Sequence, residues 1–367
     1  MKTCNLKYSK VMIAERIIPI FILLLFFSSC TAKKTQELQD AGFKHHVIFD
    51  TDANNEIDDQ HALAYLLFNG DVFAVEGVTV NATAGPGHGI SGHIDGQYDE
   101  AKRIMQLCTV FEDIPLYKGA NGSFEEIKDH IHETEFDGHE AVNFIIEEAL
   151  KYRGQELILL PVGKLTNIAL ALLKEPAIAE TVRIVWLGSN YPKPGEHNQN
   201  YDIPAMNYIL DVDVPFEMVT VRYGEPSGTS AVRVTQAQIL HRMPGKGPRI
   251  SEPIAGRHGG QFDNWGDYSV NLFEQYRMSG NPPGRPLFDQ AAVAIIKNPD
   301  WAKSYEHPAP IFRLEGRQST SARATNGEWV ERPDNPRTIT IWEWFDTDAI
   351  INDFFVTMEN YVIAERP

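Results

Sequence analysis

The segment from Val47 to Leu63 places four aspartates between two apolar stretches, and it contains no lysine or arginine: Asp50, Asp52, Asp58 and Asp59. Its first apolar run predicts a strand, its small and amide residues predict a turn, and its last run predicts a helix that opens on a carboxylate pair. Two carboxylates about 4 Å apart repel by roughly 4 kcal/mol at a protein surface. A helix N-terminus offsets only about 0.3–1 kcal/mol of that repulsion per group. The segment therefore predicts a site for a hard cation.

The same aspartates have an ordinary structural interpretation. An Asp pair at a helix start commonly caps the helix, and an Asp at a strand end is commonly solvated. Four aspartates and Glu56 fall between positions 50 and 59, however, with no basic residue among them. That concentration favours the metal site over capping.

The order Asp50-x-Asp52 followed by Asp58-Asp59 resembles the N-terminal signature of the inosine-uridine preferring nucleoside hydrolases. The resemblance implies a calcium ion that binds the sugar diol and the attacking water. In that family the loop between the second and third aspartate is shorter than the loop here, which runs through residues 53–57.

Two later segments resemble the same family. Gly163-Lys164-Leu165-Thr166-Asn167-Ile168-Ala169 resembles its Gly-x-Leu-Thr-Asn-Ile-Ala segment, which implies that the main-chain carbonyl of Val162 binds calcium. Phe288-Asp289 resembles its His-Asp pair, which implies Asp289 as a calcium ligand and places Phe288 where the family has the His associated with leaving-group activation.

Substrate contacts are also implied by the resemblance. Asn81, at the end of a predicted strand, falls on an Asn that reaches the sugar, although a turn residue is the alternative. Asn207 resembles the Asn of a Glu-x-Asn segment that binds the ribose, with the Glu position taken by Ala205 and with Asn200 as a neighbour.

The implied activity is hydrolysis of the N-glycosidic bond of a nucleoside or related riboside. Asp52 would be both calcium ligand and general base, and Asp58 would hold the 2-hydroxyl, beside which charge builds up in an oxocarbenium-like transition state. Asp50 would support the loop from behind. The implied calcium ligands are Asp52, Asp59, Asp289 and the Val162 carbonyl.

The segment 244–286 is rich in Gly, Pro and aromatic residues, and long irregular segments often serve as lids. In a lid, Trp265 or Tyr268 would stack on a base and His258 would protonate a leaving group. A loop packed on its own aromatic residues is the alternative.

Apolar runs alternate with helical patterns along residues 45–367, which predicts a single α/β domain with an open, mostly parallel, Rossmann-like sheet and helices on both faces. Ligands of such sheets bind beyond the carboxyl ends of the strands. A second Phe-Asp-Thr-Asp string, at 345–348, has no carboxylate pair after it and predicts Asp348 as a helix N-cap. The strands are expected at 73–80, 157–160, 183–187 and 216–221, and the helices at 98–107, 141–152 and 165–173.

Residues 1–29 have the basic lead and apolar core of an export signal, and Ser28-Ser29-Cys30 resembles a lipoprotein cleavage box. We expect lipidation at Cys30, a tether over residues 30–44 and a bacterial cell-envelope lipoprotein of the periplasm or outer membrane, attached to the membrane only through that lipid. An ordinary signal peptide with a coincidental Cys is the alternative.

The formal net charge of −17 argues against nucleic-acid binding. Cys108 follows a helical apolar pattern and is expected in the core rather than as a nucleophile. Two other functions compete with the hydrolase. A surface-tethered sugar or nucleoside receptor without catalysis is favoured by Ala205 and Phe288, and a dinucleotide-binding protein is suggested weakly by Gly87-x-Gly89-x-x-Gly92. The base, the sugar and the oligomeric state, a homo-oligomer included, stay open.

Overall fold

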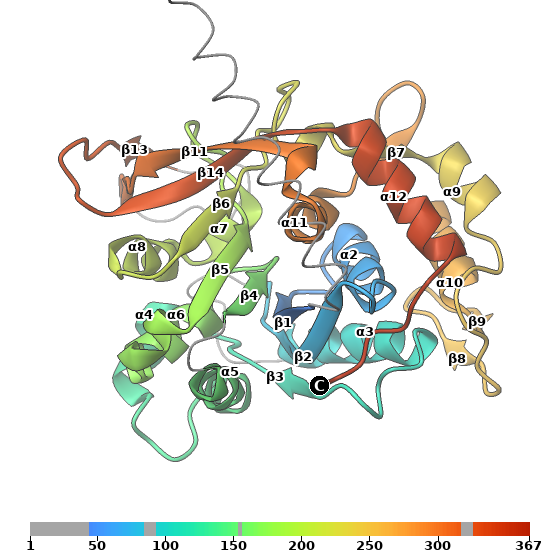
Figure 1. Cartoon of the computed structure of the whole chain (residues 1–367), viewed down its shortest axis with the longest axis horizontal. Coiled ribbons are helices and arrows are strands. Elements are labelled where there is room, and N and C mark those ends of the chain that lie inside the picture. Colours follow the sequence, from blue (N-terminus) through green and yellow to red (C-terminus); the bar gives the residue numbers. More distant parts are fainter. Residues whose placement is uncertain (1–43, 84–92, 153–155, 317–325) are drawn as a thin grey trace, which may run out of the picture. The chain divides into compact units, whose positions relative to one another are not determined.

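The computed structural model describes residues 44–83, 93–152, 156–316 and 326–367. Its strands are β1 His45–Thr51, β2 Phe73–Val80, β3 Leu116–Lys118, β4 Leu157–Pro161, β5 Val182–Leu187, β6 Phe216–Val219, β7 Arg233–Thr235, β8 Ile254–Ala255, β9 Gln261–Phe262, β10 Gly284–Pro286, β11 Ala302–Pro308, β12 Ile311–Leu314, β13 Gly327–Val330 and β14 Thr338–Phe345. Eight of them form one sheet in the order β11-β14-β6-β5-β4-β1-β2-β3 (Figure 1). Its neighbours pair in parallel, except for the antiparallel pair β11 and β14. The mostly parallel sheet is therefore confirmed.

Helices cover both faces of this sheet, as predicted (Figure 1). One apolar core lies under α2, α3, α11 and α12, and a second lies under α5, α6 and α8. The helix bounds are α2 Asp58–Leu67, α3 His93–Leu107, α4 Phe124–Ile127, α5 His139–Lys151, α6 Thr166–Lys174, α7 His197–Tyr201, α8 Ile203–Asp211, α9 Gln236–Arg242, α10 Trp265–Gln275, α11 Phe288–Lys297 and α12 Thr347–Glu359, with short 3₁₀ turns at Lys128–His130, Pro176–Glu180, Thr229–Ala231 and Pro299–Trp301.

The expected elements lie where the apolar patterns placed them. All eight residues of β2 are buried, as a strand covered on both faces requires. Cys108 is buried and has no disulfide partner, so its place in the core is confirmed. The prediction of Asp348 as a helix cap was wrong: the side chain of Asp346 accepts the hydrogen bond from the Ala349 N–H at 3.0 Å, and Asp348 lies in the first turn.

The chain changes direction across the sheet beside β1. From β1 it builds outward through β2 to β3, and it then returns to add β4 on the other side of β1. Asp50 pairs in register with Thr79 of β2 and Pro161 of β4, so the carboxyl ends of these three strands meet. Such a switch point is where parallel α/β sheets form ligand sites.

The predicted export signal, Cys30, the tether up to residue 43 and the glycines at 87–92 lie outside the described residues. Within the part of the chain that is described, no helix combines the length and hydrophobicity that crossing a bilayer requires.

Candidate active site

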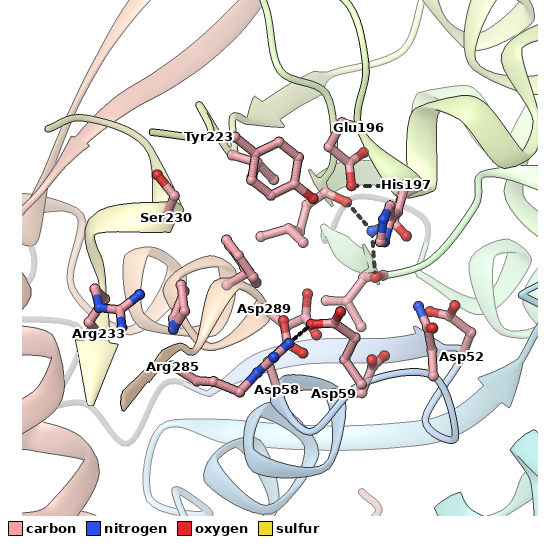
Figure 2. A pocket seen from close by; sticks show the side chains of 18 of the residues that line it. Asp52, Asp58, Asp59, Glu196, His197, Tyr223, Ser230, Arg233, Arg285 and Asp289 are labelled. Carbon is pink, nitrogen blue, oxygen red and sulfur yellow. Dashed lines mark hydrogen bonds and ion pairs between the residues drawn. The ribbon is translucent and has the colours of Figure 1, made fainter. Parts of the chain in front are cut away.

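A cavity of about 410 Å³ opens at the carboxyl edge of the sheet (Figure 2). Its walls come from the loop after β1, the start of α2, the ends of β4 and β5, the start of α7, the segment after β6, strands β7 and β10, and the start of α11. The size is that of a small-molecule site. Seven acidic residues line it: Asp52, Glu56, Asp58, Asp59, Glu196, Glu225 and Asp289.

Three aspartates meet in this cavity. One carboxylate oxygen from each of Asp58, Asp59 and Asp289 lies within 4.8 Å of the others, and all three side chains are buried. Asp52 lines the same cavity at 1% exposure, and its Oδ2 has no hydrogen-bond partner among the described residues. Asp52, Asp58, Asp59 and Asp289 thus line one cavity, and the group whose oxygens lie closest contains Asp58 where the resemblance implied Asp52.

Burial and mutual repulsion favour the protonated forms of these acids. Burial, followed by the charge of Asp58, raises the pKa of Asp59 to about 8. Burial likewise raises the pKa of Asp58 to about 7, and it holds the pKa values of Asp52 and Asp289 well above their ordinary range. Oxygen donors that repel one another in a buried cavity fit a divalent cation, because the cation replaces the protons.

The capping interpretation of the Asp58-Asp59 pair fails. The N-cap of α2 is Ile57, and no side chain caps the helix. Asp59 instead accepts a hydrogen bond from Thr51 Oγ1 at 2.7 Å, and Asp58 Oδ1 has no partner among the described residues. The two carboxylates therefore do not cap α2, and both line the cavity.

Asp50 lies behind the cavity, in the supporting position that was predicted. Its carboxylate accepts hydrogen bonds from Thr79 Oγ1, Asn81 Nδ2 and Asn167 Nδ2, each at 2.6 Å. Burial raises its pKa to about 6. Because the Asn81 amide donates to Asp50 and Asn81 does not line the cavity, its contact with a sugar stays a prediction.

Val162 lines the cavity at the end of β4, and its carbonyl accepts a hydrogen bond from Asn198 Nδ2 at 2.8 Å. A carbonyl oxygen has a second lone pair, which leaves it able to bind a cation. The glycine after it is required: a Cβ at Gly163 would lie 2.9 Å from Asp52 Oδ1 and 2.8 Å from the Asn81 amide.

Glu196 and Asn198 are site residues that the sequence interpretation missed. Glu196 caps α7 by accepting hydrogen bonds from the N–H groups of Asn198 and Gln199, and it also accepts one from the Ser189 N–H. Both Glu196 and Asn198 line the cavity. Glu196-His197-Asn198 is itself a Glu-x-Asn string, so the signal was present upstream of the position that was chosen.

The assignment of Asn207 to the substrate was wrong. Its amide donates to the Phe312 carbonyl at 2.8 Å and accepts from the Phe312 N–H at 3.0 Å, which fixes β12 against α8 away from the cavity. Ala205 is buried in the core, so it marks no lost sugar contact. Asn200 is buried in α7 and does not line the cavity, so its contact with substrate stays a prediction.

The predicted lid residues do not reach the cavity. Trp265 and Tyr268 are fully buried on α10, where Trp265 packs against His61 and Tyr268 donates a hydrogen bond to Glu100 at 2.6 Å. His258 is exposed and is not a lining residue. Base stacking by Trp265 or Tyr268 is therefore excluded by their packing, and the segment 244–286 contributes Ser279, Arg285 and Pro286 to the cavity instead.

Aromatic side chains at the cavity come from other elements. Tyr223, after β6, and Phe288, at the start of α11, both line it, with ring centroids 5.8 Å apart and planes at 80°. Phe288 has no polar atom to exchange a proton with a leaving group. The aromatic pair instead offers an apolar surface to a planar ring.

These features define a class: a doubly wound α/β protein with a buried acidic cavity, sized for a small molecule, at the switch point of its sheet. Residues 47–356 match the family model described as inosine-uridine preferring nucleoside hydrolase, and the chain therefore belongs to that family.

A curated relative is similar to this chain in sequence, and two solved structures share its fold. The chain is 26% identical over 226 residues to the pyrimidine-specific ribonucleoside hydrolase RihB of Escherichia coli O17:K52:H18, an alignment that covers 55% of this chain and 66% of that protein. An inosine-guanosine nucleoside hydrolase shares the fold at a TM-score of 0.63 and 18% identity, covering 87% of this chain and 99% of the other. An inosine-uridine preferring nucleoside hydrolase from Bacillus anthracis does so at 0.58 and 16%, covering 87% and 100%.

Proposed function

We propose that this protein hydrolyses the N-glycosidic bond of a nucleoside or related riboside with the help of bound calcium, giving the free base and the sugar. The observation that carries the proposal is the meeting of Asp58, Asp59 and Asp289 within 4.8 Å, in the cavity that Asp52 also lines. Family membership supports the reaction class. The relatives are named for pyrimidine, inosine-uridine and inosine-guanosine substrates, so the base preference is not part of the proposal.

The donors in the cavity suit calcium because they are all oxygens. Asp52, Asp59, Asp289 and the Val162 carbonyl would hold the ion, and the remaining positions of a coordination shell of about 6–8 oxygens would go to the sugar diol and a water. When bound, calcium would lower the pKa of that water and fix the diol. Asp58 would bind either the ion or the 2-hydroxyl, since its oxygen lies within the same 4.8 Å group.

The remaining steps belong to side chains of this protein. Asp52 would accept the proton of the attacking water on its unpartnered Oδ2. Glu196 and Asn198 would bind further sugar hydroxyls from the α7 side of the cavity. Tyr223 and Phe288 would pack against the base. Because Phe288 has no polar atom, residue 288 would not protonate the base as it leaves.

A substrate panel tests this function. The purified protein is incubated with purine and pyrimidine ribosides and with their 2-deoxy counterparts, with calcium or after exhaustive chelation, and reducing sugar and free base are both measured. We expect equal amounts of the two products from ribosides, little from deoxyribosides, and loss of turnover on chelation that added calcium restores. Full turnover in the chelated protein would show that the metal role is misassigned.

One alternative function has an observation in its favour. Phe288, in place of a proton-donating residue, suits a receptor that binds a nucleoside without cleaving it. Binding of a riboside in calorimetry with no free base after prolonged incubation would establish the receptor.

We also propose that the protein is exported and lipidated at Cys30, on the basis of the segment 1–30. Metabolic labelling with a tagged fatty acid tests the assignment, with Cys30→Ser as the variant that should lose both the label and membrane attachment.

A further inference from the structure

The charges that line the cavity are separated. Asp52, Asp58, Asp59, Asp289 and Glu196 form no ion pair with a lysine or arginine among the described residues. The other two acids are compensated: Glu56 pairs with Arg285, and Glu225 pairs with Lys193. Negative charge without an ion-pair partner among the described residues is thus carried by the acids where the metal and sugar are proposed to bind.

Arg233 has the opposite imbalance. It lines the cavity from β7, and within the described ranges its guanidinium meets no carboxylate. Its Nη2 donates to the main-chain carbonyls of Ser279 at 2.7 Å and Gly284 at 3.0 Å, which are neutral. Figure 2 shows Arg233 beside Ser230 at one side of the cavity and Asp52 at the other. A fixed positive charge therefore lies at the end remote from Asp52.

The setting of Arg233 is rigid. It pairs in register with Pro286 across the β7–β10 ladder, and its two carbonyl contacts hold the guanidinium plane in place. An arginine fixed in this way presents its remaining N–H donors without a further ordering cost, which suits two-point recognition of a carboxylate. Arg285 adds a second positive group from β10, beside Glu56 and 4.1 Å from the Tyr276 ring centroid.

We propose that Arg233 is the anion-binding group of this cavity, and that the preferred substrate carries a carboxylate on its base. The inference rests on the proposed function, because the sugar takes the acidic end and the base then extends past Tyr223 and Phe288 toward Arg233. A neutral base leaves this charge without a partner. A base with a ring carboxylate supplies one.

The test compares two substrates that differ by one carboxylate. The kcat/KM for 5-carboxyuridine is divided by that for uridine in the wild type, in Arg233→Gln and in Arg233→Lys. We expect a preference for 5-carboxyuridine in the wild type, a fall in the ratio of about tenfold or more in R233Q, and partial retention in R233K, because a charge-assisted hydrogen bond is lost or weakened. Both substrates are measured on one sample, so the ratio does not depend on the fraction of folded protein.

Arg249→Gln is the matched control. Arg249 is exposed, pairs with Asp263 and does not line the cavity, so its loss removes one positive charge without touching the site and should leave the ratio unchanged. An unchanged ratio in R233Q would overturn the inference and leave the hydrolase intact. An Arg233-dependent preference for uridine 5′-monophosphate instead would place the anion on the sugar and also overturn it.

If no riboside is cleaved, the proposed function fails and the inference is decided by binding. Calorimetry then compares uracil-5-carboxylate with uracil on the calcium-loaded protein. Tighter binding of the carboxylate that R233Q abolishes supports the anion site, and equal binding of the two compounds in the wild type refutes it.

Discussion

The chain contains the string Phe-Asp-Thr-Asp twice, at 49–52 and at 345–348, and the two copies have different structural roles. The first ends β1, a central strand, and both of its aspartates are buried. The second begins at the last residue of β14, a strand next to the sheet edge, and both of its aspartates are exposed. The same four residues give a candidate catalytic site in one place and a helix cap in the other.

Neighbouring strands make the difference. Around Asp50, the ends of β2 and the start of α6 provide three hydrogen-bond donors that hold the carboxylate in the interior. At the second copy, the Asp346 carboxylate accepts a hydrogen bond from the first turn of its own helix, α12. A carboxylate kept away from water acquires a raised pKa. Several such carboxylates in one buried cavity favour binding of a cation that replaces their protons.

The largest expected effect separates Asp52 from Asp348. Asp52→Asn removes the proposed base and a calcium ligand, and we expect kcat to fall by about 10²–10⁴-fold. Asp348→Asn makes the same chemical change at the matching position of the exposed copy, and kcat should stay within about twofold because surface substitutions have small effects. Steady-state release of free base measures kcat for both variants. Comparable losses of kcat would show that the buried and the exposed copy do not differ in function.

A second, smaller effect concerns proton and metal competition at the buried copy. Asp58 and Asp59 have pKa values of about 7 and 8 in the folded, metal-free chain, against an ordinary value of 3.8. Between about pH 4 and pH 8 the folded chain therefore binds more protons than the unfolded chain, so the stability of the metal-free protein falls as pH rises through that range.

Calcium replaces those protons, so its stabilising effect should be larger at pH 8 than at pH 5. At a free concentration a hundredfold above its dissociation constant, the stabilisation is about 2.7 kcal/mol. Thermal unfolding with calcium and with a chelator, at both pH values, gives the comparison. Equal gains in Tm at the two pH values would mean that protons and calcium do not share the site. Asp346→Asn is the control, and it should leave the calcium response unchanged.

Sequence patterns were sufficient to predict the features that depend on residues close together in the chain. The apolar run of β2 and the amphipathic helices were identified because burial repeats with the period of each element, and the aspartates after β1 stood out by their density. Glu196 was missed because the Glu-x-Asn pattern was assigned to Asn207, which has Ala205 in the Glu position, although Glu196 and Asn198 fit it fully. The fold shows that Glu196 and Asn198 face the cavity. Trp265 was assigned to a lid because the composition of the segment 244–286 is typical of a loop. Its helix, α10, instead packs into the core.

Longer-range relations had no signal in the sequence at all. Arg233 and Arg285 line one cavity because β7 and β10 pair. The sequence of neither three-residue strand indicates that it pairs with the other. The same holds for the donors around Asp50, which come from β2 and α6. Prediction from a single sequence ends where a role depends on which strands lie side by side.

The smallest expected effect tests which aspartate of the exposed copy has a structural role. The Asp346 carboxylate satisfies the Ala349 N–H, one of the donors that the first turn of α12 leaves without a helical partner. Asp346→Ala removes that acceptor, and an N-cap loss of this kind costs about 1 kcal/mol of the free energy of unfolding. Asp348→Ala removes a carboxylate two residues along that caps nothing, and its cost should stay within about 0.5 kcal/mol. Urea unfolding of the metal-free variants measures both. A larger loss in the free energy of unfolding from Asp348→Ala than from Asp346→Ala would show that Asp348 is the cap. It would also show that the role of this four-residue string can be predicted without knowing its structural neighbours.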